Sequence, residues 1–282
     1  MDTQDPIVSA EWLLSNISAP DLRIVDATWF PSWTAGAGAG RRQYESGHIP
    51  GAVYFDIDVI ADTSSDLPHM LPDQVKFSSH VRKLGLGDGH RIIIYDSNDF
   101  FASARVWWMF RVMGHRDVHV LDGGRRAWLR AGGELEDLPP MVTERHYTPR
   151  VRTDLVRTTQ QVREASEEGS AKVLDARPAG RFAGAAPEPR EGLASGHIPN
   201  STNVPSASLV GSDGRLVPEE QLLKLLAPYR DEPVIATCGS GVSAAVIALA
   251  LARLGNWDVA IYDGSWTQWA SDPANPIKTQ VS

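Results

Sequence analysis

The pattern that decides the fold lies in one stretch, Pro233-Val-Ile-Ala-Thr-Cys238-Gly-Ser-Gly-Val-Ser-Ala-Ala-Val-Ile-Ala-Leu-Ala-Leu-Ala-Arg-Leu-Gly255. Its first part, Val234 to Thr237, is short and apolar with β-branched residues, which is typical of a buried parallel strand. From Val242 onward the apolar run has the length of a buried helix, and Gly255 follows where a helix end accepts a positive φ. A tight loop that holds Cys238, the only cysteine of the chain, joins the two elements. The stretch therefore predicts an open α/β sheet with its chemistry at the carboxyl end of a strand.

The loop around Cys238 favours an ionised thiol. Gly239 and Gly241 allow the backbone to curl, so that successive N–H groups can face the sulfur. The helix that follows adds the positive end of its dipole. A lone cysteine is more often an inert core residue, but the order strand, Cys, Gly-x-Gly, helix favours a reactive nucleophile here.

Two enzyme classes place a nucleophilic cysteine in such a loop. Cysteine-dependent phosphatases need an arginine six positions after the nucleophile to bind phosphate, and this chain has Ala244 there. The loop Cys238-Gly-Ser-Gly-Val-Ser-Ala244 instead resembles the active-site loop of the rhodanese superfamily, in the form carried by mercaptopyruvate sulfurtransferases. Thiosulfate sulfurtransferases resemble it as well, but they carry Arg and Lys where this chain has Gly239 and Ser240.

The composition argues against several classes of partner. The chain has 282 residues, one cysteine and a formal net charge of −8 at pH 7. This negative charge disfavours nucleic acid and anionic membranes as partners, no apolar run has the length of a membrane span, and the N-terminus lacks a signal-peptide pattern. A single cysteine cannot form an internal disulfide, and a reactive thiol survives in a reducing cytosol, so we expect a cytoplasmic protein.

The chain repeats itself, which predicts a tandem duplication. Ser46-Gly-His-Ile-Pro50 recurs as Ser195-Gly-His-Ile-Pro199, an offset of 149 residues. Val25-Asp-Ala27 recurs with the same offset as Leu174-Asp-Ala176. A third motif, Asp-Gly followed by a tryptophan, recurs with an offset of 141 residues, at Asp122 and Trp128 and again at Asp263 and Trp269.

Each half shows strands that alternate with helices, so we expect the α/β class, with a doubly wound parallel sheet flanked by helices in each half. The resemblance implies that these halves are two tandem rhodanese-like domains. The first helix of each half begins after a capping residue, Ser9 or Thr158, and Gln161 completes a capping box with Thr158. The predicted strands are Leu22–Asp26, Ala52–Phe55, Arg91–Tyr95 and Val118–Leu121 in the first half and Val173–Asp175, Thr202–Val204, Val234–Thr237 and Val259–Tyr262 in the second.

We predict a non-catalytic first domain over residues 1–133, a linker over 134–154 and a catalytic domain over 155–282. The linker prediction rests on a segment rich in proline and charge that shows no periodicity. Gly36, Gly38 and Gly40 are spaced like a phosphate-binding loop, but no predicted strand precedes them and no predicted helix follows, so we expect a flexible loop there.

The two halves differ at the position that matters most. Alignment of the third strands places Asp96 opposite Cys238. Because a carboxylate cannot carry a sulfur atom, only the second half can be catalytic, and the first half serves as scaffold. Residues shared by both halves, such as His48 and His197, are expected to be structural.

Residues that break the repeat are candidates for substrate binding. Arg181 and Arg190 lie in the loop after the first strand of the second half, and two fixed guanidiniums can hold an α-keto carboxylate. Solvated surface arginines are an equal alternative from the sequence alone. The resemblance to mercaptopyruvate sulfurtransferases implies the substrate role, because Gly-Arg181-Phe and Glu-Pro-Arg190 match the substrate arginines of that family.

A second candidate group combines residues of both halves. An arrangement of Asp, His and hydroxyl can relay a proton, and the resemblance implies this role for Asp58, His69 and Ser240. The alternative is a capping aspartate and a surface histidine. The resemblance also implies that the loop around Cys238 lines the substrate site, with Ser243 where the family usually has Thr; these loop residues are Gly239, Gly241, Val242 and Ser243.

The resemblance implies a sulfurtransferase that needs no metal or organic cofactor. The Cys238 thiolate would attack the sulfur of 3-mercaptopyruvate and release pyruvate, and the persulfide would then pass its sulfur to a thiol acceptor or to cyanide. The acceptor would be a thioredoxin-like protein or a low-molecular-weight thiol. One alternative is a thiosulfate:cyanide sulfurtransferase, which the neutral Gly239-Ser240 disfavours because thiosulfate is a dianion. The other is a non-catalytic rhodanese module that binds partners or senses oxidants, which the intact Cys238 loop disfavours.

Overall fold

The computed structural model describes residues 5–279, and the chain forms two compact units. The first unit consists of Met1–Thr63, Leu71–Arg152 and Ser212–Leu216, and the second of Ser64–Met70, Thr153–Gly211 and Val217–Ser282. Each unit therefore includes one short segment from the other half of the sequence. The predicted α/β class with one parallel sheet in each half is confirmed, whereas the domain borders at 133 and 155 stay predictions.

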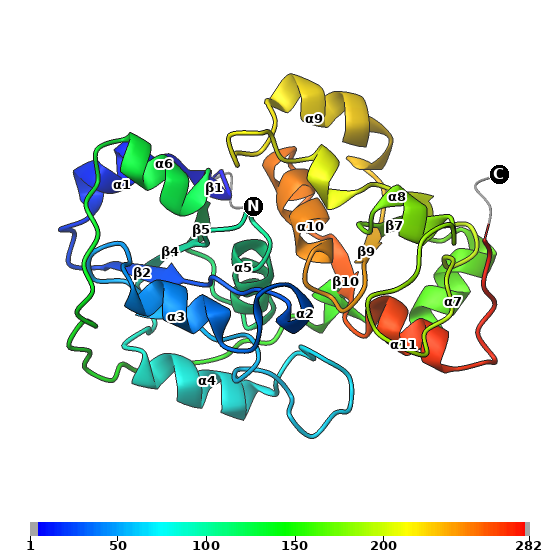
Figure 1. Ribbon diagram of the computed structural model, residues 1–282, viewed down its shortest axis with the longest axis horizontal. Coiled ribbons are helices and arrows are strands. Elements are labelled where there is room, and N and C mark those ends of the chain that lie inside the picture. The colour runs from blue at the N-terminus through cyan, green and yellow to red at the C-terminus, as the bar shows by residue number, and fades with distance from the viewer. Residues whose placement is uncertain (1–4, 280–282) are drawn as a thin grey trace. The chain divides into compact units, whose positions relative to one another are not determined.

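The first unit contains a parallel five-stranded sheet with the strand order β1-β5-β4-β2-β3 (Figure 1). The central strand β4 is paired over its whole length with β2, from Leu22 opposite Arg91 to Asp26 opposite Tyr95. The strands are β1 (Ile7–Val8), β2 (Leu22–Asp26), β3 (Val53–Tyr54), β4 (Arg91–Tyr95) and β5 (Val118–Leu121).

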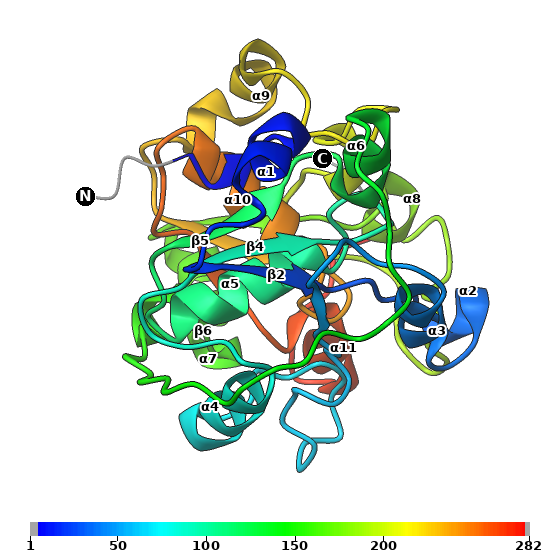
Figure 2. The same ribbon diagram turned by 90° about the vertical axis from the view of Figure 1, so that its left-hand side faces the viewer.

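Helices cover both faces of this sheet (Figure 2). One face carries α1 and α6, whose Leu13 and Trp128 pack with Ile24 and Ile93 of the strands. The opposite face carries α4 and α5, where Phe77 and Phe110 meet edge to face. The helices of this unit are α1 (Ala10–Asn16), α2 (Ser32–Ala35), α3 (Ala39–Glu45), α4 (Gln74–Lys83), α5 (Ser103–Val112) and α6 (Gly124–Arg130).

The second unit repeats this architecture with the strand order β6-β10-β9-β7-β8, again parallel throughout. The two orders correspond strand by strand, as a tandem duplication requires. The strands are β6 (Val156–Arg157), β7 (Lys172–Asp175), β8 (Thr202–Asn203), β9 (Val234–Thr237) and β10 (Ala260–Tyr262).

Helices α7 and α11 cover one face of the second sheet, and α9 and α10 cover the other (Figure 1). The helices are α7 (Thr159–Glu168), α8 (Ala179–Phe182), α9 (Glu219–Leu226), α10 (Ala244–Arg253) and α11 (Ser265–Ser271), with 3-10 turns at Thr153–Leu155, Ser206–Ser208 and Ala227–Tyr229. Within residues 5–279, no helix combines the length and apolar character needed to cross a membrane.

Local sequence signals account for most element boundaries. The Ser9 hydroxyl accepts the Trp12 N–H at 3.1 Å, and Thr158 and Gln161 form the predicted capping box. Helix α10 begins at Ala244, two residues after the predicted start, and Gly255 follows its end with a φ of 99°. The two-residue edge strands β1 and β6 were not predicted, because a strand of that length shows no periodicity.

The prediction of a flexible loop around Gly36, Gly38 and Gly40 is wrong for its last part. Helix α3 begins at Ala39 and contains Gly40, which is buried. A Cβ on Gly40 would lie 2.0 Å from the carbonyl oxygen of Thr28, so this glycine is needed for a close approach of helix and loop. Glycine has low helix propensity, and such packing leaves no trace in the local pattern.

The repeated histidines serve the same structural purpose in both units. His48 and His197 are buried, and the Nδ1 atoms lie 2.9 Å from the Tyr44 carbonyl oxygen and 2.8 Å from the Phe182 carbonyl oxygen. Each imidazole stacks on the ring of that same residue, with centroids 4.0 and 3.9 Å apart. This matched geometry supports the expectation that the two histidines are structural.

Asp96 occupies the turn after the central strand β4. Its buried carboxylate accepts backbone N–H groups from Asn98 (3.1 Å), Phe100 (3.2 Å), Ala102 (3.1 Å) and Ser103 (2.8 Å). Burial raises the pKa of this carboxyl, and the N–H groups oppose the shift. The turn after β4 is therefore an anion-binding loop that its own side chain fills.

We expect Asp96→Ala to lower the free energy of unfolding by about 3 kcal/mol or more, because several buried N–H groups would lose their acceptor. Asp96→Asn keeps one oxygen and should lose clearly less. Urea unfolding of the three proteins measures both effects. Equal stability of Asp96→Ala and wild type would show that the carboxylate does not hold the loop.

Candidate active site

Cys238 directly follows the central strand β9 of the second unit, at the position that Asp96 has in the first. Its side chain is 2% exposed, and the first turn of α11 holds the backbone beside it. The Cys238 carbonyl accepts the Trp266 N–H at 2.9 Å, and the Gly239 carbonyl accepts the N–H and the hydroxyl of Thr267 at 3.0 and 2.6 Å. The loop is therefore fixed from the adjacent strand-to-helix turn.

Ser265 binds two N–H groups of this loop, and sequence reasoning missed it. Its hydroxyl oxygen accepts N–H groups from Cys238 at 3.2 Å and from Gly241 at 3.0 Å, and it donates to the Tyr262 carbonyl at 2.8 Å. The residue is fully buried with a φ of 50°, in the left-handed region that non-glycine residues rarely adopt. The first unit has Gly124 at the matching place of its Asp-Gly motif, so comparison of the repeats could have revealed this serine.

Two predicted substrate arginines lie beside the loop. A Cβ on Gly239 would be 3.2 Å from Arg181 Nη2 and 3.8 Å from Arg190 Nη1, which places both guanidiniums against the loop backbone. Arg190 Nη2 also donates to Ser240 Oγ at 3.3 Å. Burial lowers the pKa of Arg190; negative charge on Cys238 opposes this shift, and the positive charge of Arg181 adds to it.

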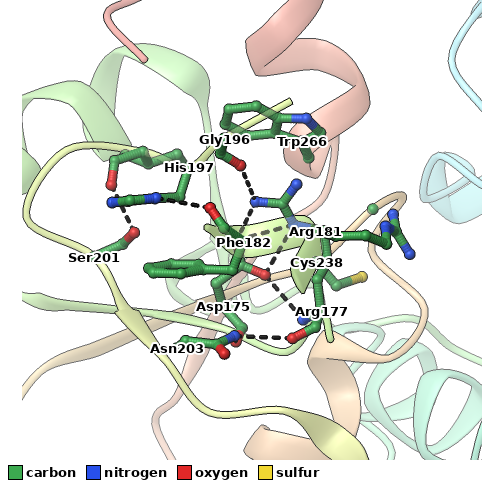
Figure 3. A network of polar contacts seen from close by, with 12 residues as sticks. Asp175, Arg177, Arg181, Phe182, Gly196, His197, Ser201, Asn203, Cys238 and Trp266 are labelled. Atoms are coloured by element: carbon green, nitrogen blue, oxygen red, sulfur yellow. Dashed lines mark hydrogen bonds and ion pairs between the residues drawn. The ribbon is translucent and has the colours of Figure 1, made fainter. Parts of the chain in front are cut away.

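A buried ion-pair system adjoins Arg181, and Figure 3 shows its members Asp175 and Arg177. Arg177 is 1% exposed, pairs with Asp175 and lies over the ring of Trp266, 4.3 Å from its centroid. Arg177 Nη1 donates to Glu188 Oε1 at 2.8 Å, and the other oxygen of Glu188 accepts from Arg181. The carboxylates of Asp175 and Glu188 outweigh the effect of burial and raise the pKa of Arg177.

The remaining loop residues lead into α10. Val242 is buried, its carbonyl accepts the Ala245 N–H at 3.2 Å, and the Ser243 carbonyl accepts the Val246 N–H at 3.1 Å. The second unit contains the whole cysteine loop and both candidate arginines, namely Cys238, Gly239, Ser240, Gly241, Val242, Ser243, Arg181 and Arg190.

The predicted proton relay of Asp58, His69 and Ser240 involves both units. Asp58 belongs to the first unit, where its Oδ2 accepts the Trp29 indole N–H at 2.8 Å. His69 belongs to the segment Ser64–Met70, which is part of the second unit together with Ser240, and it has a φ of 60°. The relay itself stays a prediction.

The part of the chain from residue 5 to residue 279 holds no group of three or more His, Cys, Asp or Glu side chains that could bind a metal ion. The chemistry that the site offers is that of one sulfur atom, a curled backbone loop and two guanidiniums. Such an arrangement suits attack by a thiolate on an anionic donor.

A family model, the rhodanese-like domain, matches residues 9–131 and 158–272 of the chain. The chain belongs to the rhodanese family. The chain is 39% identical to the 3-mercaptopyruvate sulfurtransferase of Escherichia coli (strain K12), over 96% of its own length and 98% of the relative. It is 38% identical to thiosulfate/3-mercaptopyruvate sulfurtransferase 1, mitochondrial, of Arabidopsis thaliana, over 100% of its own length and 80% of the relative.

Among solved structures, the chain is similar to SseA from Escherichia coli, a 3-mercaptopyruvate sulfurtransferase. The two share 38% identity with a TM-score of 0.84, over 93% of this chain and 99% of SseA. The family and the fold expected from the Cys238 loop and the repeat are thereby confirmed.

We expect Ser265→Ala to slow alkylation of Cys238 by iodoacetamide at pH 7 by about tenfold, because two loop N–H groups lose their acceptor and the loop loses its shape. Cys238 is the only thiol of the chain, so the total rate reports on this residue alone. Ser271→Ala is the matched control, since that serine lies at the other end of α11 and donates to the Thr267 carbonyl. Equal alkylation rates in all three proteins would show that Ser265 does not support the loop.

Proposed function

We propose that this protein is a sulfurtransferase that takes a sulfur atom from 3-mercaptopyruvate and carries it as a persulfide on Cys238. The observation that carries the proposal is the position of Arg181 and Arg190 against the backbone of the Cys238 loop. The printed activity of the Escherichia coli relative, at 39% identity over nearly the whole chain, supports the same donor.

Donor binding follows from the charges around the loop. 3-Mercaptopyruvate has one carboxylate at the far end from its sulfur. Arg181 and Arg190 would bind this carboxylate and the adjacent carbonyl oxygen through charge-assisted hydrogen bonds. The donor sulfur would then point toward Cys238, at the end of β9.

The first chemical step forms one S–S bond and breaks one C–S bond. The Cys238 thiolate attacks the donor sulfur, and the electron pair of the C–S bond moves onto the carbon to give the enolate of pyruvate. The N–H groups of Gly239, Val242 and Ser243 would stabilise charge on the outer sulfur, whereas that of Gly241 donates to the Ser265 hydroxyl and shapes the loop. The enolate takes a proton and leaves as pyruvate.

The second step regenerates the enzyme. An acceptor thiolate attacks the outer sulfur of the persulfide, forms a new S–S bond and leaves Cys238 as a thiolate. Cyanide would accept the same sulfur as thiocyanate. We propose a thioredoxin-like protein or a low-molecular-weight thiol as acceptor and a reducing compartment such as the cytoplasm, because a single exchange-active thiol suits such conditions.

We further propose that Asp58, His69 and Ser240 move the proton that converts the enolate to pyruvate. Two observations support this role. Ser240 Oγ accepts from Arg190, which keeps it at the donor site, and the segment with His69 groups with the same unit. An imidazole oriented by a carboxylate is a common proton donor in such a position.

Thiosulfate is the second candidate donor, and the Arabidopsis relative carries both donors in its name. The residues after Cys238 are the neutral Gly239 and Ser240. A dianion that approaches a thiolate at 4 Å meets a repulsion of ~4 kcal/mol per unit-charge pair at an effective dielectric of about 20. Without cations directly after Cys238, we expect thiosulfate to be the poorer donor.

We expect purified wild-type protein to gain the mass of one sulfur atom on Cys238 after incubation with 3-mercaptopyruvate, and to release an equal amount of pyruvate. Cys238→Ser should show neither effect, because a serine oxygen cannot hold a sulfane sulfur. Intact-protein mass spectrometry with a lactate dehydrogenase assay measures both quantities. Pyruvate release by Cys238→Ser at more than trace rates would refute the persulfide mechanism.

We expect His69→Ala and Ser240→Ala each to slow persulfide formation, and the double variant to lose less than the two single losses combined. Groups that move one proton together act as a unit, so their effects are not additive. Single-turnover release of pyruvate gives the rate of this step. Strictly additive losses in rate would refute the relay, even if each single variant were slower than wild type.

A further inference from the structure

Hydrogen bonds to Glu188 hold the Arg181 side chain in one orientation at the donor site. Glu188 Oε2 accepts from Arg181 Nε at 3.1 Å and also from Arg181 Nη2. The edge of the guanidinium that contains Nε and Nη2 is therefore bound to Glu188. A donor carboxylate has to meet this guanidinium from its outer side, where Nη2 also approaches Gly239.

Arg177 in turn holds Glu188 in place. Its side chain is only 2% exposed, and its Oε1 accepts from Arg177 Nη1 at 2.8 Å. Arg177 is anchored at the end of β7 by Asp175, and its Nη2 donates to the Gly196 carbonyl at 2.8 Å (Figure 3). A continuous series of ion pairs thus runs from the sheet to Arg181.

The charges in this series cancel. Asp175 and Glu188 contribute two negative charges, and Arg177 and Arg181 contribute two positive charges. Glu188 therefore weakens the positive field that Arg181 presents to an anion. The weakening costs a dianion more than a donor with one carboxylate, because the interaction energy scales with the charge of the donor.

The series exists only in the unit that carries the cysteine. At the offset of 149 residues, the counterpart of Arg177 is Thr28, and the Thr28 N–H donates a hydrogen bond to Asp26 Oδ1 at 2.8 Å. The first sheet folds with the same topology without an arginine or a glutamate in this place. If these ion pairs served only the fold, both copies should need them.

We propose that Glu188 is a positioning residue for the donor: it fixes the Arg181 guanidinium for one carboxylate and lowers the preference of the site for dianions. This inference rests on the proposed use of 3-mercaptopyruvate. Glu188 acts through Arg181 and does not touch the reacting sulfur atoms. It should therefore affect donor binding and leave the transfer of sulfur from the loaded enzyme to the acceptor unchanged.

Glu188→Gln tests the proposal, because the amide has nearly the same shape but places an NH2 group against an N–H donor. KM for 3-mercaptopyruvate should rise about tenfold with kcat within about threefold of wild type, the signature of lost binding common to ground state and transition state. kcat/KM for thiosulfate should stay constant or rise. A merely structural role would lower kcat/KM for both donors in parallel.

A double-mutant cycle with Arg181→Ala shows whether Glu188 works through that arginine. Glu188→Gln should add less than about twofold to KM in the Arg181→Ala background. Glu191→Gln, an exposed carboxylate three residues along the same loop, is the matched control and should leave both donors unaffected. If Glu188→Gln does not fold, Glu188→Asp keeps the charge but is shorter by one methylene, and it should raise KM for 3-mercaptopyruvate without improving thiosulfate.

The outcomes separate this inference from the proposed function. Wild-type protein that releases no pyruvate from 3-mercaptopyruvate would overturn the proposed function itself. Active wild type with unchanged kinetics in Glu188→Gln, with a parallel loss on both donors, or with full additivity in the cycle would overturn the role of Glu188 alone.

Discussion

The convergence of backbone N–H groups after the central strand of each sheet is the constraint on which the rest of the structure depends. Buried N–H groups need an acceptor, and the two units supply different ones. In the first unit the Asp96 carboxylate accepts four of them. In the second unit the corresponding side chain is a thiol that has to remain available, so the Ser265 hydroxyl holds part of the loop from outside.

Charged side chains near the nucleophile of the second unit also need partners. Its donor site needs positive groups close to a sulfur nucleophile, yet buried cations are stable only when they are paired and hydrogen-bonded. Arg177 is buried and paired twice, and Glu188 extends the pairing to Arg181 at the edge of the site. The buried carboxylate of Glu188 thus holds the partly exposed guanidinium of Arg181 in one orientation at the edge of the site.

Sequence reasoning recovered the architecture because the architecture is encoded in patterns. The strands Leu22–Asp26, Arg91–Tyr95, Val118–Leu121 and Val234–Thr237 have the predicted bounds, and the repeat at offset 149 predicted two equal sheets. Cys238 was identified from its place between a strand and a helix, and Arg181 and Arg190 from the resemblance to mercaptopyruvate sulfurtransferases. The structure brings the two arginines to the cysteine loop. Their roles in catalysis stay predictions.

The residues that sequence reasoning missed act through geometry. Ser265 matters because of a left-handed φ and two accepted N–H groups, and Glu188 because two arginines converge on it. Gly40 matters because a helix passes close to a carbonyl oxygen. None of these relations appears in periodicity or composition. The relay of Asp58, His69 and Ser240 was inferred from a resemblance, since residues so far apart in the chain have no sequence pattern that joins them.

Gly124 has an evolutionary consequence for the duplicated chain. A Cβ at this position would lie 2.2 Å from the Asp96 carbonyl oxygen, so a serine like Ser265 does not fit there without a shift of the backbone. Replacing Asp96 by cysteine would remove the acceptor of its loop, and adding the serine first would create a collision. Each of these replacements made alone would therefore damage the loop of the first unit. A second nucleophile in this chain would need both replacements together with a shift of the backbone beside Gly124, so the two loops can no longer exchange their side chains.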